Sequence, residues 1–108
     1  MSKFYKIEDE SKKDLIISIL AEKYHRQILE NISNKSKTAI EISNETRIPI
    51  STVYRKIEML QKVKLIAMSG VIGNDGKKIF FYKSRVEEIK TWFENGYFDV
   101  NINFKKTN

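Results

Sequence analysis

The chain has 108 residues, one proline, no cysteine and a formal net charge of +6 at pH 7. This length predicts a single domain, and the lack of cysteine excludes disulfides, thiolate metal sites and cysteine redox switches. A composition that is 41% apolar and 31% charged, with so little proline, favours a mainly α fold around one modest core.

The positive charge is concentrated in one part of the chain. Residues 51–84 contain seven Lys or Arg and two acidic residues, which is +5 of the total +6, whereas residues 85–99 carry −2. This segregation is expected for a surface that binds a polyanion such as nucleic acid. The longest apolar run, residues 15–21, is far shorter than the roughly 20 residues of a membrane span, and the N-terminus has no signal-peptide layout. We therefore expect a cytoplasmic protein that does not bind membranes.

The first part of the chain predicts a flexible arm followed by two helices. Residues 1–10 show no clear period, and a helix is expected from Ser11, whose spacing to Asp14 fits a capping box. A shift of phase near residue 22 predicts a break before a second helix. The first helix is apolar on more than one side, which is consistent either with burial inside the monomer or with coverage by a second subunit. Its apolar stripe is Leu15, Ile16, Ile19 and Leu20.

Residues 38–62 predict two helices joined by a tight turn at residues 46–49. Pro49 suits the first turn of the second of these helices, about 50–62. Apolar residues recur in it every three or four positions, so one face is expected to be buried. The exposed face carries side chains able to contact DNA bases: Ser51, Thr52, Tyr54, Arg55 and Lys56. This pattern is typical of a helix-turn-helix with a recognition helix, although Ser51 and Thr52 can also cap backbone amides.

After the recognition helix the pattern becomes that of strands, and residues 65–83 predict a β-hairpin. Its turn at residues 73–77 is rich in residues that accept positive φ. A basic hairpin directly after a recognition helix indicates the wing of a winged helix; a structural hairpin with solvated lysines is the alternative. The residues expected to contact phosphates are Lys62, Lys64, Asn74, Lys77 and Lys78.

The chain is predicted to end with a helix and a short tail. Ser84 can cap a helix over residues 85–95, and Gly96 suits the position after its end. From residue 97 to 108 apolar and polar residues alternate, which predicts a possible strand. The expected domain, residues 11–96, is thus mainly α, with four helices, one small β-hairpin and a C-terminal helix.

Two segments resemble ArsR-like winged-helix regulators, with the character of archaeal members. Residues 19–30 (ILAEKYHRQILE) resemble the entry segment of that family, and residues 48–60 (IPISTVYRKIEML) resemble its recognition helix. The resemblance covers about residues 15–83 and implies a homodimer joined through the first and last helices. Metal-sensing members carry cysteines on the helix before the recognition helix, and this chain has none, so thiolate metal sensing is excluded and any small-molecule effector stays open. The dimer interface that the resemblance implies consists of Leu15, Ile16, Ile19, Leu20, Val86, Ile89, Trp92 and Phe93.

The sequence therefore predicts a transcriptional regulator that binds double-stranded DNA sequence-specifically and needs no cofactor. Arg55 is the residue expected to contact guanine with two hydrogen bonds. The alternative is a winged-helix protein-interaction module that docks to the transcription machinery with little DNA specificity. An enzyme is not expected, because His25 is the only histidine and no cysteine is present to complete a metal site or a dyad with it.

Overall fold

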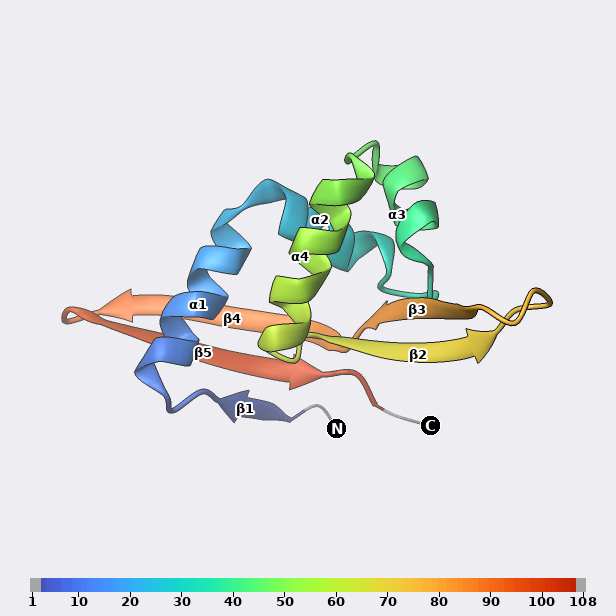
Figure 1. Ribbon diagram of the computed structural model, residues 1–108. Coiled ribbons are helices and arrows are strands. Elements are labelled where there is room, and N and C mark those ends of the chain that lie inside the picture. Colours follow the sequence, from blue (N-terminus) through green and yellow to red (C-terminus); the bar gives the residue numbers. More distant parts are fainter. Residues whose placement is uncertain (1–2, 107–108) are drawn as a thin grey trace.

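A computed structural model describes residues 3–106, which form four helices and five strands (Figure 1). In chain order these are β1 (Phe4–Lys6), α1 (Glu10–Ala21), α2 (Lys23–Asn31), α3 (Ala39–Thr46), α4 (Ile50–Lys62), β2 (Ile66–Ile72), β3 (Lys78–Ser84), β4 (Val86–Glu94) and β5 (Tyr97–Phe104). The strands make two antiparallel sheets, one of β2 and β3 and one in the order β1-β5-β4. None of the helices in residues 3–106 has the length and apolar character of a membrane span.

The central unit consists of α2, α3, α4 and the β2–β3 hairpin. Thr38 begins α3 with a capping box, in which its hydroxyl accepts from the Glu41 amide and the Glu41 carboxylate accepts from the Thr38 amide. Arg47 ends α3 in the left-handed conformation, with φ of 66°, and Pro49 precedes α4 with an extended backbone. Lys37 also pairs with Tyr82 of β3 as an isolated bridge. Residues before α3 therefore add to the edge of the hairpin.

The core of this unit is built from the apolar stripes of its helices. Val53, Ile57 and Leu60 of α4 are buried against α2, α3 and the base of the hairpin, as their spacing predicts, whereas Ile50 in the first turn is 39% exposed. Leu65, just after α4, is also completely buried. The main residues of this core are Ile28, Ile32, Ile42, Ile48, Val53, Ile57, Leu60 and Leu65.

The expected C-terminal helix is wrong, because residues 86–94 form the strand β4. The chain reverses at Asn95 and Gly96, whose φ angles are 51° and 81°. Two consecutive positive φ angles are those of a two-residue type I′ hairpin turn, for which Asn-Gly is the preferred sequence. Glu94 and Tyr97 pair on either side of this turn. The prediction of a mainly α fold is therefore also wrong: 40% of the residues are helical, and 34% lie in the strands of two antiparallel sheets.

The two ends of the chain meet in the second sheet. Within the segment expected to be a flexible arm, Phe4–Lys6 forms β1 and pairs with residues 101–103 of β5. The alternating C-terminal residues form β5, which lies between β1 and β4. α1 packs on this sheet, with Ile16 and Ile19 buried together with Val100 and Ile102. The C-terminal strand β5 thus belongs to the hydrophobic core, and β1 pairs with it at the edge of the sheet.

Candidate nucleic-acid interface

The outer face of α4 carries polar and cationic side chains on a rigid support. Val53, Ile57 and Leu60 are buried on one side of the helix, and Ser51, Tyr54 and Arg55 are exposed on the other. Arg55 Nη2 donates to Thr52 Oγ1 over 3.1 Å. The N-cap position of α4 is Pro49 and makes no side-chain capping bond. Ser51 is therefore an exposed residue of the first turn of α4. Thr52 orients Arg55 by accepting its hydrogen bond.

Lys56 lies elsewhere than on this outer face. Its ammonium group is within 2.5 Å of Glu22 Oε2, and only 20% of its side chain is exposed. Glu22 is the extended residue that separates α1 from α2. Lys56 therefore ties α4 to the break between the first two helices, and this contact holds the orientation of the exposed face.

His25 completes this cluster from α2. It is 5% exposed, and its Nδ1 lies 3.1 Å from Glu22 Oε2, although neither ring nitrogen makes a well-formed hydrogen bond within the described part of the chain. Burial lowers the pKa of His25 below its ordinary value of 6.5. The negative charge of Glu22 acts to raise this pKa, and the positive charge of Lys56 lowers it further. Burial works to raise the pKa of Glu22, but the hydrogen bond from Lys56 and the charges of His25 and Lys56 lower it below 4.5. Near neutral pH the cluster is thus a neutral imidazole beside an ion pair.

Mild acid is expected to destabilise the fold through His25. Because its folded pKa lies below 6.5, the unfolded chain takes up this proton first, and stability is lost as pH falls below about 6.5. Thermal unfolding followed by circular dichroism between pH 7.5 and 5 should show this loss, and His25→Gln should remove most of it. The Glu22 contribution disappears only below pH 4.5 and does not interfere. An unchanged pH dependence in His25→Gln would contradict this role.

The residues predicted to contact phosphates are exposed at the end of α4 and along the hairpin. Lys62 lies in the last turn of α4, and Lys64 follows with φ of 61°. In the hairpin turn the Gly73 amide donates to the Lys77 carbonyl, and the Lys77 amide donates to Asp75 Oδ1. Lys78 Nζ lies over the Phe80 ring, 5.6 Å from its centroid. Asn74 is exposed at the same turn.

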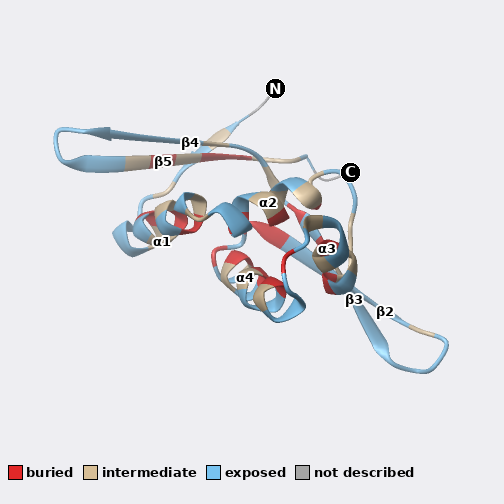
Figure 2. Ribbon diagram, turned by 90° about the horizontal axis from the view of Figure 1, so that it is seen from above, coloured by how far each residue is buried: buried red, intermediate tan, exposed pale blue. Residues whose placement is uncertain are grey.

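Seen from above, the elements that carry these groups lie on one side of the molecule. α4 and the tip of the β2–β3 hairpin are on the lower side of Figure 2, and the β4–β5 hairpin is on the opposite side. Sequence reasoning missed Arg47, an exposed cation in the turn immediately before α4. The signal was available, because an arginine at a turn position between two predicted helices is seldom buried. Arg47, Arg55, Lys62 and the hairpin lysines thus surround the exposed face of α4.

The residues predicted as a dimer interface fall into three groups. Ile16 and Ile19 are at most 1% exposed and belong to the monomer core. Trp92 and Phe93 are 43% and 64% exposed, and they lie near the tip of the β4–β5 hairpin. The half-buried residues of the set are Leu15, Leu20, Val86 and Ile89.

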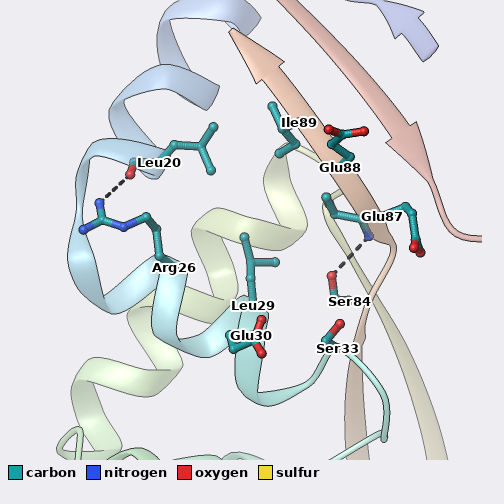
Figure 3. A pocket seen from close by; sticks show the side chains of 10 residues that line it. Leu20, Arg26, Leu29, Glu30, Ser33, Ser84, Glu87, Glu88 and Ile89 are labelled. Carbon is teal, nitrogen blue, oxygen red and sulfur yellow. Dashed lines mark hydrogen bonds between the residues drawn. The ribbon is translucent and has the colours of Figure 1, made fainter.

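A hollow of about 300 Å³ lies between the first two helices and the start of β4 (Figure 3). Leu20, Leu29 and Ile89 form its apolar wall, and the acidic residues Glu87 and Glu88 stand on the β4 side. The Arg26 guanidinium donates to the Leu20 carbonyl over 2.6 Å. Residues 3–106 contain no group of three His, Cys, Asp or Glu side chains placed to hold a metal ion. The hollow is therefore a mixed polar and apolar surface along the outer edge of β4.

Comparison with known proteins places the fold but carries over no residue's role. No protein-family model and no curated protein matches the chain. Among solved structures, the fold is similar to that of a possible transcriptional regulator from Methanosarcina mazei Go1, with a TM-score of 0.57 and 18% sequence identity. The match covers 77% of this chain and 76% of that chain. At this identity, the similarity shows a shared fold alone.

Proposed function

We propose that the protein is a transcriptional regulator that binds double-stranded DNA sequence-specifically as a winged helix. The proposal rests on the exposed face of α4, where Thr52 Oγ1 accepts a hydrogen bond from Arg55, and on the basic β2–β3 hairpin, whose tip lies on the same side of the molecule as α4 (Figure 2). A helix of this width fits the major groove, in which each base pair presents a distinct pattern of donors and acceptors. The name of the Methanosarcina mazei structure, a possible transcriptional regulator, supports the same role.

The exposed residues divide between base and backbone contacts. Arg55 is the base-reading residue, because its guanidinium can donate two hydrogen bonds to guanine O6 and N7. Ser51 and Tyr54 flank it on the exposed face. Lys62, Lys64, Lys77 and Lys78 bind phosphates on either side of the groove, and Asn74 at the hairpin tip contributes a neutral donor. Lys56 does not contact DNA in this proposal; its ion pair with Glu22 holds α4 in position.

We propose a homodimer for this role, but not through two helices. The resemblance to ArsR-like regulators implies contact through the first and last helices, and here residues 86–94 are a strand. The part of the resemblance that supports the proposal is therefore the recognition helix. Nor does the proposal include catalysis, because the single histidine is buried beside an ion pair.

A salt titration tests the backbone contacts. Lys77→Ala should weaken binding to specific and random duplexes by the same factor. It should also reduce the slope of log affinity against log salt by about 0.9, because one phosphate contact releases about one counterion. Fluorescence anisotropy with labelled duplexes at several salt concentrations measures both quantities. An unchanged slope would remove Lys77 from the interface.

The β4–β5 hairpin favours a second candidate function, a protein-interaction module. Its exposed aromatic residues, including Trp92 and Phe93, are typical of a protein contact. Binding of a random duplex at low salt separates the two functions. A DNA-binding protein with this charge should bind it at micromolar concentration, and an absence of binding would favour the interaction module.

A further inference from the structure

The tip of the β4–β5 hairpin exposes aromatic side chains that the rest of the fold does not cover. Trp92, Phe93, Tyr97 and Phe98 are 43%, 64%, 71% and 41% exposed. β1 supports only residues 101–103 of β5, so the hairpin is two-stranded beyond them. A two-stranded hairpin is at best marginally stable alone in water, and an exposed apolar patch of this kind marks an interface. The tip therefore requires a partner.

The aromatic residues lie on both faces of the hairpin. Phe93 pairs with Phe98, with ring centroids 5.1 Å apart, and Phe98 continues the face on which Val100 is buried. Trp92 and Tyr97 belong to the opposite face, since side chains alternate along each strand. A partner surface laid on one face would leave the other exposed. A strand added to the edge of the hairpin provides neighbours on both faces at once.

One edge of the hairpin is available for such a strand. Within residues 3–106, β4 is an outer strand in the order β1-β5-β4 and has no strand partner on its other side. Residues 86–89 line the hollow beside α1 and α2, and residues 90–94 are not among the residues that line it. Every second residue of an outer strand directs its N–H and C=O groups outward. Residues 90–94 thus form an unpaired edge next to the aromatic tip.

We propose that this edge pairs with the same edge of a second copy, antiparallel, about a two-fold axis at Trp92. The pairing joins two three-stranded sheets into one and places Trp92 beside Trp92 of the second copy. It also sets Lys90 opposite Glu94 twice, once on each side of the axis, so the edge is complementary to itself in charge. Moving the axis two residues to Lys90 would instead oppose two lysines, which is unfavourable. The charges of β4 therefore favour the register centred on Trp92 over the one centred on Lys90.

The surface available at this edge suits a weak dimer. Aromatic side chains bury about 150–250 Å² each, so Trp92 and Phe93, which lie on the paired strand and are about half exposed, offer roughly 200 Å² per copy. The paired backbones and the neighbouring Lys90, Thr91 and Glu94 add to this area and bring it towards the roughly 800 Å² per partner of a standard interface. The hairpin points away from α4, so both recognition helices stay accessible (Figure 2). The inference deepens the proposed function by naming the dimer contact of the regulator.

Charge reversal tests the proposal in the full chain. Lys90→Glu alone opposes like charges at both ends of the pairing, and Glu94→Lys alone does the same. Each variant should raise the dimer dissociation constant about tenfold or more in sedimentation experiments. An equimolar mixture of the two variants places unlike charges opposite each other at both positions and should restore association. Since Trp92 is the only tryptophan, its emission should shift to longer wavelength when the wild-type dimer is diluted.

Three outcomes would overturn the proposal. The first is a wild-type chain that stays monomeric, with constant Trp92 emission, up to about 100 μM, which is on the order of a weak dimer's dissociation constant. The second is a dimer whose dissociation constant neither charge reversal changes. The third is a mixture of the two variants that fails to associate. A monomeric chain would leave the aromatic tip to a different protein. Because oligomeric state is measured without DNA, failure here leaves DNA binding untouched, and a loss of DNA binding leaves this result unchanged.

Discussion

Replacing Ile102 by Ala is expected to lower the free energy of unfolding by about 2–5 kcal/mol. Ile102 lies in β5, is 1% exposed and belongs to the core cluster together with Ile16 and Ile19 of α1. The substitution removes buried methyl and methylene groups and leaves a cavity that the β1-β5-β4 sheet and α1 cannot easily close. Urea unfolding followed by circular dichroism gives this change directly. The result tests whether the C-terminal residues are part of the core.

Ile72→Ala is the matched control, because it is the same change at a residue of β2 that is 71% exposed. Its effect on stability should stay within about 0.5 kcal/mol. Equal effects of the two substitutions would mean that the C-terminal strand does not pack on α1. Both variants should be compared at one protein concentration, since a dimer would add a concentration-dependent term to stability.

Replacing Arg55 by Ala is expected to cost about 1–3 kcal/mol of binding to a specific site and much less on a random duplex. The reason is that a bidentate contact to guanine exists only on the specific site, whereas Arg55's charge contributes modestly to both. Arg55→Lys is the informative companion, because it keeps the charge but cannot reproduce the fork of two parallel hydrogen bonds. It should retain affinity for random DNA and lose most of the discrimination. Anisotropy titrations at fixed salt measure both affinities.

An equal loss on specific and random DNA would show that Arg55 contacts phosphates instead of bases. Lys56→Ala provides a useful contrast. Its ammonium group is paired with Glu22, so removing it should first reduce stability by leaving a half-buried carboxylate without its partner.

Local sequence signals predicted the part of the fold that carries the candidate site. Pro49 marks the start of α4, and the glycines and aspartate at residues 73–76 mark the hairpin turn, because their backbone preferences act over a few residues. The cap of the first helix is Asp9, two residues before the predicted cap Ser11. Such shifts at helix ends have little effect on the site.

The error at residues 85–95 has a physical cause. Val86, Ile89, Trp92 and Phe93 follow a helical spacing, and Gly96 has the positive φ that a residue after a helix also adopts. The deciding signal was Asn95 directly before Gly96, since two positive φ angles in succession form a hairpin turn and not a helix end. The β-branched and aromatic residues of this segment also favour a strand.

The contact of Lys56 with Glu22 could not be predicted from local patterns. These residues are 34 positions apart, and their meeting depends on how α4 packs against the break between α1 and α2. On a helical projection Lys56 belongs to the polar face of α4, like Arg55. Because of this packing, Lys56 supports α4 through Glu22, whereas its neighbour Arg55 stays exposed.

Selection of bound sequences from a random pool of duplexes tests the central claim most directly. The full chain, incubated with the pool at moderate salt, should enrich a defined sequence over successive rounds. For the dimer we predict an inverted repeat whose half-sites are separated by one or more turns of DNA, with a guanine whose enrichment is lost in Arg55→Ala. A pool that stays random after repeated rounds would contradict sequence-specific DNA recognition by this protein.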